Sequence, residues 1–162
     1  MENSFETIYI NNIPNTVRLS DTLDELPENC VFNKVTTGCG ATHIALTNLI
    51  PTIVAVPYRV LVQDKVEDEQ YKVLGMSCDY PVDKILPGTF KIICTFNSLE
   101  NLSKLVDISK YTLIVDEAHL LIQNASYSPK AITWMMQNFT KFRTFTFMSA
   151  TLHDRELWLP QL

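Results

Sequence analysis

The feature that most constrains the fold is an apolar run that ends abruptly in two acidic residues. Residues 111–115 read YTLIV, and Asp116 and Glu117 follow them directly. Apolar and β-branched side chains on both faces predict a strand in the middle of a parallel sheet that is covered on both sides. Such sheets bind ligands at the carboxyl ends of their strands. Asp116 and Glu117 are therefore predicted to lie at a binding site.

Two adjacent carboxylates at this position suit phosphate chemistry. One would hold a hydrated Mg²⁺, and the other would orient or deprotonate a water for attack on a phosphate. The structural alternative is that a chain simply becomes polar where it leaves the core. The other motifs of the chain bear on this choice.

A second polar segment joins a predicted strand at residues 30–36 to a predicted helix that ends near residue 49. Two of the four glycines in the whole chain, Gly38 and Gly40, fall in this segment. Glycines at a strand-to-helix turn let backbone N–H groups converge on a phosphate, and Thr42 is placed to give Mg²⁺ a hydroxyl ligand. The predicted nucleotide-binding residues are Thr37, Gly38, Cys39, Gly40, Ala41, Thr42 and His43.

The remaining pattern is an alternation of strands and helices, which predicts an α/β fold with a mainly parallel central sheet. We expect one domain at residues 29–162 after an N-terminal lead-in at residues 1–28, with Trp134 and Met135 facing the core. Further strands are predicted at 7–10, 52–57, 71–76, 90–96 and 144–148, and further helices at 20–26, 59–66, 98–106 and 129–139.

The order of the motifs resembles that of superfamily 2 helicases, over roughly residues 29–152. Residues 116–119, DEAH, resemble motif II (the Walker B motif), and residues 35–42, VTTGCGAT, resemble motif I, A-x-T-G-x-G-K-T. Residues 149–151, SAT, match motif III. The resemblance implies a three-layer RecA-like P-loop NTPase domain, the first of the two that such an enzyme contains.

Ala41 departs from motif I, because the family has a lysine there that reaches the β- and γ-phosphates. A deliberate Lys-to-Ala substitution would leave the same sequence. Lys34 and His43 are the nearest cation candidates along the chain. Since alanine is small, we expect space at this position, so that Ala41→Lys would reach the phosphates without disturbing the core.

Two more segments resemble the family's contacts to the backbone of a single DNA or RNA strand. Residues 57–61, PYRVL, resemble motif Ia, P-T-R-x-L, although Asp64 stands where the family has glutamine. Residues 94–99, CTFNSL, resemble the G-T-x-x-S-L segment. An arginine that ends a surface turn and a serine that only caps a helix are the structural alternatives. The implied nucleic-acid contacts are Pro57, Tyr58, Arg59, Thr95 and Ser98.

The resemblance also implies a mechanism that uses ATP and Mg²⁺. Thr42 and Asp116 would hold the metal, Glu117 would polarise the attacking water, and His119 would bond towards motif III. There Ser149, Ala150 and Thr151 couple the nucleotide state to strand binding. The chain ends at Leu162, so a second RecA-like domain, in cis or in trans, is expected as a partner that supplies the arginine finger. A pseudo-ATPase that serves as a nucleic-acid or protein binding module, and a non-helicase P-loop enzyme, are the alternatives.

Composition limits the kinds of partner and the cellular compartment that we expect for this protein. A net charge of −5 and a pI near 5.1 argue against a chain that coats nucleic acid by bulk charge, although they leave room for a narrow track on one face. No run approaches the ~20 apolar residues of a membrane span, and the N-terminus lacks a secretory signal. Four cysteines without a C-x-x-C pair predict free thiols in a reducing cytoplasm, or in the nucleus or a viral factory for a eukaryotic or viral source.

Overall fold

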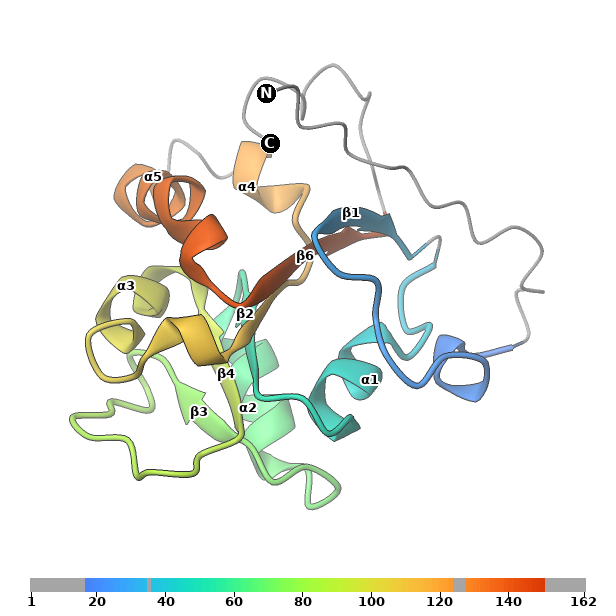
Figure 1. Ribbon diagram of the computed structural model, residues 1–162, viewed down its shortest axis with the longest axis horizontal. Helices are drawn as coiled ribbons and strands as arrows, with labels where there is room; N and C mark the ends of the chain where they lie inside the picture. The colour runs from blue at the N-terminus through green and yellow to red at the C-terminus, as the bar shows by residue number, and fades with distance from the viewer. Residues whose placement is uncertain (1–16, 35, 124–127, 151–162) are drawn as a thin grey trace.

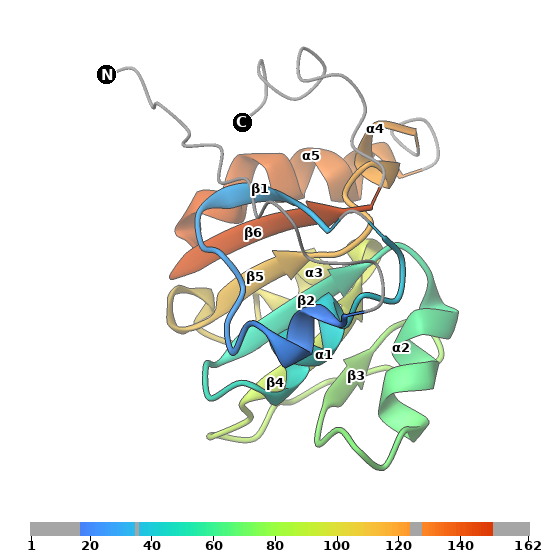
Figure 2. The same ribbon diagram turned by 90° about the vertical axis from the view of Figure 1, so that its right-hand side faces the viewer.

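Six parallel strands form one sheet in the computed structural model, which describes residues 17–34, 36–123 and 128–150. The strand order is β1-β6-β5-β2-β4-β3, and every pairing is parallel (Figures 1 and 2). The predicted α/β class and the mainly parallel sheet are thereby confirmed. The strands are β1 Cys30–Asn33, β2 Thr52–Val56, β3 Leu74–Met76, β4 Lys91–Thr95, β5 Thr112–Val115 and β6 Thr144–Ser149.

The strand that precedes the two carboxylates lies inside the sheet, as its apolar pattern predicts. β5 lies between β6 and β2, and all of its residues are buried. Side chains that alternate along β2 enter two separate cores, with Ile53 in one and Val54 in the other. A sheet with a core on each face needs strands that are apolar at nearly every position.

Helices cover both faces of the sheet. Figures 1 and 2 show α1 (Ala41–Thr47) and α2 (Arg59–Glu67) on one face, and α3 (Leu99–Leu102) and α5 (Pro129–Asn138) on the other. The short helix α4 (Leu120–Gln123) follows the turn after β5. The remaining helical turns are of the 3₁₀ type: η1 Leu19–Asp21, η2 Phe96–Ser98, η3 Ile108–Lys110 and η4 Phe139–Lys141.

Two predicted helices are much shorter than expected. The helix predicted at 98–106 is regular only over Leu99–Leu102, because Leu105 and Val106 both donate their N–H groups to the carbonyl of Leu102 in a tightening turn. The helix predicted at 20–26 is only the turn Leu19–Asp21, because Leu26 packs into the core from an irregular segment. The strand predicted at 7–10 lies outside the described residues.

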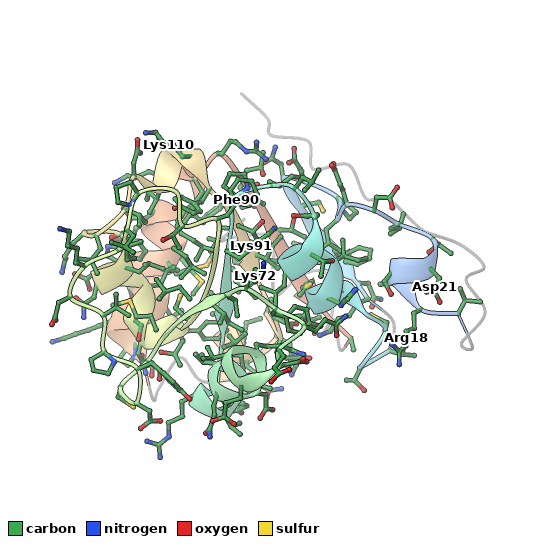
Figure 3. The ribbon with its side chains drawn as sticks, turned by 90° about the horizontal axis from the view of Figure 1, so that it is seen from below. Arg18, Asp21, Lys72, Phe90, Lys91 and Lys110 are labelled. Atoms are coloured by element: carbon green, nitrogen blue, oxygen red, sulfur yellow. The ribbon has the colours of Figure 1, made fainter. Side chains whose placement is uncertain are left out.

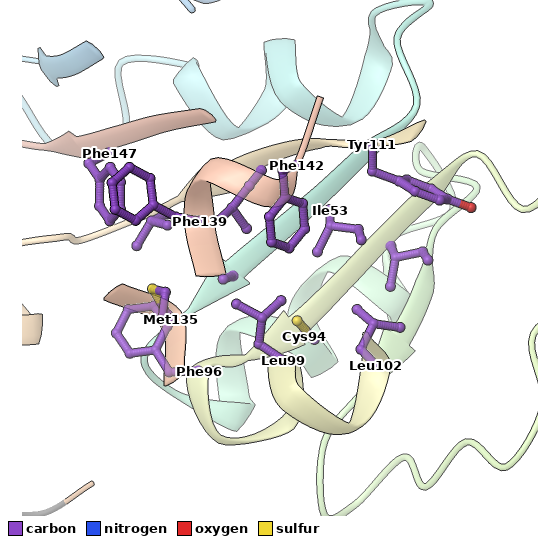
Figure 4. Close-up of a cluster of buried hydrophobic side chains, with 14 of the residues drawn as sticks. Ile53, Cys94, Phe96, Leu99, Leu102, Tyr111, Met135, Phe139, Phe142 and Phe147 are labelled. Atoms are coloured by element: carbon purple, nitrogen blue, oxygen red, sulfur yellow. The ribbon is translucent and has the colours of Figure 1, made fainter. Parts of the chain in front are cut away.

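The larger core lies between the sheet and the α3–α5 face (Figure 4). Phe139 packs edge-to-face on Phe147, with ring centroids 5.4 Å apart. Met135 is fully buried in this core, and Trp134 packs against it with part of its surface exposed. Both residues therefore face the core, as predicted. Among the described helices, none combines the length and the apolar character that a bilayer crossing requires.

Candidate functional site

The polar motifs meet at one edge of the sheet, because parallel strands place all their carboxyl ends on the same side. Two clefts open there. The first, here called the glycine-loop cleft, has a volume of about 490 Å³, and the second, called the strand-end cleft, has about 1020 Å³. Gly38, Cys39, Gly40, Ala41, Thr42 and His43 line the glycine-loop cleft together with Lys34.

A buried ion cluster lies beside the glycine-loop cleft. The Lys34 ammonium donates to Asp116 Oδ1 at 2.7 Å and to Glu117 Oε1 at 2.6 Å. The side chains of Lys34 and Asp116 are only 6% and 10% exposed, and that of Glu117 is 23% exposed. We call these three residues the acidic cluster. It joins the end of β1 to the end of β5.

The acidic cluster is connected to the glycine loop by Thr42. The Thr42 hydroxyl donates to Asp116 Oδ2 at 2.7 Å, so both oxygens of this carboxylate are engaged. Thr42 and Asp116 are 74 residues apart in sequence. The structure thus brings together the residues that were predicted to hold a metal.

Glu117 adopts a left-handed backbone conformation, with φ of +50°. This region is uncommon for residues other than glycine and is often found at functional sites. The Glu117 N–H donates to Asp116 Oδ1 at 2.8 Å, and the next N–H, of Ala118, returns to the carbonyl of Met148 in β6. The turn therefore holds the Glu117 carboxylate towards Lys34.

Charge in the acidic cluster is only partly balanced, because one ammonium faces two carboxylates. Burial opposes the charge on Lys34, but the adjacent Asp116 and Glu117 carboxylates outweigh it and raise the pKa of Lys34 above its ordinary value. With Lys34 protonated and both acids ionised, the cluster carries one net negative charge. A further cation at this position would balance that charge.

The oxygen atoms here fit Mg²⁺. This ion usually takes one or two protein oxygens and completes its shell with water and phosphate oxygens. The carboxylate of Asp116 and the hydroxyl of Thr42 are adjacent oxygens at the mouth of the glycine loop, and the Lys34 ammonium already rests on the carboxylate as a cation. Among the described residues, no group of three or more His, Cys, Asp or Glu side chains is arranged around a common metal position.

The glycine loop needs both of its glycines in left-handed conformations. Gly38 has φ of +72° and Gly40 has φ of +93°. A Cβ on Gly40 would lie 2.9 Å from the Ser20 hydroxyl, and no described atom lies within 4 Å of a Cβ built on Gly38. The loop is therefore backed by η1 on one side and open at Gly38. The Leu19 N–H also donates to the Cys39 carbonyl at 2.7 Å.

Ala41 lies between the core and the glycine-loop cleft. Its side chain is 2% exposed and belongs to the core that lies against α1. The same residue also lines the glycine-loop cleft. That a lysine at this position would reach the phosphates without disturbing the core therefore stays a prediction.

The histidines of the two motifs have different partners. His119 Nδ1 lies 2.7 Å from Ser149 Oγ and 3.4 Å from Glu117 Oε2, which confirms the predicted link from His119 towards Ser149. Ala150 follows at the end of β6 and is half-buried, and Thr151 lies outside the described residues. His43 Nδ1 lies 3.0 Å from the Tyr71 hydroxyl, so it is held away from the acidic cluster.

The strand-end cleft contains all five residues that were predicted to contact nucleic acid. Pro57, Tyr58 and Arg59 come from the end of β2, and Thr95 and Ser98 come from the end of β4. The hydroxyls of Thr95 and Ser98 lie 2.9 Å apart, and the Ser98 side chain makes no capping hydrogen bond to α3. Ser98 thus occupies the N-cap position of α3, as one interpretation predicted, but its hydroxyl bonds to Thr95 and does not cap the helix.

Arg59 and Tyr58 are the exposed groups of this cleft. Tyr58 is 52% exposed. The Arg59 guanidinium lies 3.4 Å from Asp79 Oδ1, with both side chains more than half exposed. Neither side chain is fixed by burial, so both remain available to a ligand.

No protein-family model matches the chain, and no curated protein has a matching sequence. Functional inference for this protein therefore depends on its own residues and their geometry.

The sequence alone did not predict the contacts of Lys34. It indicated Lys34 only as a nearby cation, while the structure places its ammonium between both motif II carboxylates. The one sequence feature that could have indicated this role is the position of Lys34, near the end of a predicted strand and shortly before the glycine loop. Reasoning from sequence also assigned no site to the lead-in, although Arg18, Ser20 and Asp21 line the glycine-loop cleft.

Proposed function

We propose that this chain is the first RecA-like domain, with a three-layer P-loop NTPase architecture, of a superfamily 2 helicase or translocase. It binds ATP with Mg²⁺ and, together with a second RecA-like domain in cis or in trans, couples hydrolysis to movement on a DNA or RNA strand. The single observation that carries the proposal is the hydrogen bond from Thr42 to Asp116, at 2.7 Å across 74 residues. It joins a residue of the glycine-loop cleft to a carboxylate that lies beside this cleft, as the proposal requires.

Thr42 in the glycine-loop cleft and the motif II residues beside the cleft have separate roles in this proposal. Mg²⁺, when bound, supplies positive charge to the phosphate oxygens, and Thr42 and Asp116 are the residues that would hold it. Glu117 accepts a proton from the attacking water. His119 lies 3.4 Å from the Glu117 carboxylate and 2.7 Å from Ser149, so it orients this base and connects it to motif III.

The strand-end cleft is the proposed nucleic-acid site. Arg59 offers a charged donor to a phosphate, and the Thr95 and Ser98 hydroxyls offer neutral donors close by. Tyr58 offers an exposed ring on which a base can stack. A cleft with few charges fits an acidic protein that holds a strand locally rather than by bulk attraction.

A second candidate function is a pseudo-ATPase that acts as a binding module. One observation favours it, since the motif I lysine is replaced by Ala41 and this side chain is buried. Such a protein would bind nucleic acid or a protein partner at the strand-end cleft without nucleotide turnover.

Calorimetry with ATP, in the presence and absence of Mg²⁺, tests the proposed function. Asp116→Asn is expected to weaken Mg²⁺-dependent binding, whereas Glu117→Gln is expected to keep binding and to abolish hydrolysis in a complete enzyme. Asp64→Asn, an exposed change on α2, is the matched control and should leave binding as it is. Binding that ignores both Mg²⁺ and Asp116→Asn would refute the metal site.

Steady-state phosphate release gives a second measure. The chain without a partner domain is expected to turn over very little ATP, because an arginine finger contributes about 10³–10⁵ in rate. Robust turnover by the chain alone that disappears in Glu117→Gln would show that no partner is needed to complete the site.

A further inference from the structure

We infer that Lys34 supplies the phosphate-binding ammonium that motif I places at position 41. In the empty protein this ammonium pairs with Asp116 and Glu117, and on nucleotide binding it turns to the terminal phosphates. The inference rests on the proposed function, because it names the residue that contacts the phosphates in the same cleft.

The first observation is that Lys34 has access to the right cleft from a fixed backbone. Its N–H donates to the Ser149 carbonyl at 2.9 Å, which continues the pairing of β1 with β6 by one residue. Its side chain lines the same cleft as Gly38, Gly40 and Thr42. A lysine held in this way presents its ammonium without the freedom of a loop.

The second observation is that position 41, where motif I has its lysine, carries no charge in this protein. Ala41 is buried in the core against α1, with 2% of its surface exposed. In this protein the cleft therefore receives its central positive charge from the end of β1, while the start of α1 is used for packing.

Two other basic residues of the cleft contact Tyr71. The Lys65 ammonium lies 4.9 Å from the centre of the Tyr71 ring, and His43 bonds to the Tyr71 hydroxyl. The Arg18 side chain is exposed. Among the described cations that line this cleft, Lys34 is the one whose ammonium contacts Asp116 and Glu117.

Charge explains why Lys34 would change partners. A triphosphate brought beside Asp116 and Glu117 meets two carboxylates, and a single ammonium cannot remain on both and also neutralise phosphate oxygens. Asp116 and Thr42 would hold Mg²⁺, whose charge would balance the Asp116 carboxylate, so that the Lys34 ammonium could leave Asp116 for the phosphates. The Glu117 carboxylate then competes with the phosphates for the same ammonium, so removing its charge should favour nucleotide binding.

A purely structural role is the alternative, in which Lys34 only ties β1 to β5. That role predicts that Lys34→Met lowers the stability of the fold and affects nucleotide affinity no more than other substitutions that lower it equally. Lys34→Met combined with Glu117→Gln removes one charge of each sign, so that fewer buried groups lack a partner than in Lys34→Met alone.

The experiment is a set of dissociation constants for Mg·ATP and Mg·ADP on the 162-residue chain, with folding checked by circular dichroism. One charge-assisted contact corresponds to about 10- to 100-fold in affinity. We expect Lys34→Met to weaken ATP by about this factor, with a smaller loss for ADP, both alone and in the Glu117→Gln background. Glu117→Gln alone should tighten ATP, and this gain should vanish when Lys34→Met is added. Lys65→Met, which removes another lysine of the same cleft, should change ATP affinity little.

The outcomes distinguish a failure of the role assigned to Lys34 from a failure of the proposed function. If the unsubstituted chain binds ATP and the folded Lys34→Met variants bind it equally well, Lys34 has no role at the phosphates and the proposed function stands. A loss in Lys65→Met as large as that in Lys34→Met would also overturn the assignment to Lys34. If the unsubstituted chain binds neither nucleotide, the proposed function and the inference about Lys34 fail together.

Discussion

The glycine-loop cleft and the strand-end cleft lie at the same edge of the sheet but are stabilised in different ways. In the first, ionic hydrogen bonds of 2.6–2.7 Å join buried side chains from distant parts of the chain. In the second, Tyr58 and Arg59 are exposed, and the Arg59–Asp79 pair has a longer separation of 3.4 Å. The side chains of the first site are thus ordered before a ligand arrives, with the Lys34 ammonium as the group that we infer to change partners, whereas the second site can adapt.

This difference fits the ligands that we propose for the two clefts. Phosphate chemistry requires oxygens and cations at defined positions, which burial and charge pairing provide. A nucleic-acid strand that moves through a site needs contacts that form and break easily, which exposed side chains provide. Because the acidic cluster is buried, removing any one of its side chains takes a partner away from another and should lower the stability of the fold.

The largest expected effect is on stability. Asp116→Ala leaves the Lys34 ammonium with one carboxylate and leaves Thr42 without its acceptor, so we expect the free energy of unfolding to fall by about 3 kcal/mol. Asp79→Ala removes the corresponding acid beside Arg59, where both side chains are exposed, and should cause no measurable change. Urea denaturation of the two variants makes the comparison. Equal losses would show that the two clefts do not differ in this way.

Binding of single-stranded nucleic acid, unlike stability, should depend on the exposed residues of the strand-end cleft. Arg59→Ala is expected to weaken binding about tenfold, with a smaller slope against salt, because one phosphate contact is lost. Arg143→Ala is a matched control, since this exposed arginine lies at the other edge of the sheet and pairs with Glu28 at 3.6 Å. Fluorescence anisotropy at two salt concentrations measures both. Equal weakening by the two variants would mean that binding is diffuse and not centred on the strand-end cleft.

Thiol labelling can follow each cleft separately, because each contains a cysteine. Cys39 lies in the glycine loop and Cys78 lines the strand-end cleft, whereas Cys30 and Cys94 are buried. Burial raises the pKa of Cys30 to about 11 and also raises that of Cys94, so both react slowly. We expect Mg·ATP to slow labelling of Cys39 and an oligonucleotide to slow labelling of Cys78. Mass spectrometry of labelled peptides resolves the two, and protection of the opposite cysteine by each ligand would reverse the assignment of the clefts.

The smallest expected effect is a difference between two buried lysines, Lys34 and Lys91, in how their contributions to stability depend on pH. Lys91, at the amino end of β4 (Figure 3), donates to neutral oxygens of Ala45, Asn48, Ile50 and Thr52. Burial without an acidic partner lowers its pKa to about 8, against the ordinary 10.5. Between these two values the unfolded chain holds a proton that the folded chain has lost, so the contribution of Lys91 to stability rises with pH.

For Lys34 the sign is opposite, because its pKa is raised in the folded state. Its contribution is fully present below the ordinary lysine pKa and is lost only as pH rises through the higher folded value. From pH 9 to pH 10, the stability of the unsubstituted protein should rise relative to Lys91→Met by about 1 kcal/mol, because over this range the unfolded chain still holds most of the proton that the folded chain has lost. The difference from Lys34→Met should stay constant over the same range. A constant difference for Lys91→Met would show that its oxygen partners hold the charged form.

The strands of the sheet and the turn at the glycine loop could be predicted from sequence patterns. β5 was predicted from the apolar run before Asp116, and the strand-to-helix turn was predicted from Gly38 and Gly40, because periodicity and backbone freedom are local properties. The order of the motifs also placed Thr95 and Arg59 at one edge, since parallel strands put their carboxyl ends together. Helix lengths were less well predicted, because the ends of α3 and η1 are set by packing of Leu105 and Leu26.

The partners within the site were decided only by the tertiary structure. Nothing local to Lys34 indicates that its ammonium would meet Asp116, which is 82 residues away in sequence. Likewise, only the tertiary structure shows that Ala41 contributes both to the core and to the lining of the glycine-loop cleft. A sequence therefore determines which chemical groups reach the edge of such a sheet. The packing of distant elements decides which groups are paired, which are buried and which remain available to a ligand.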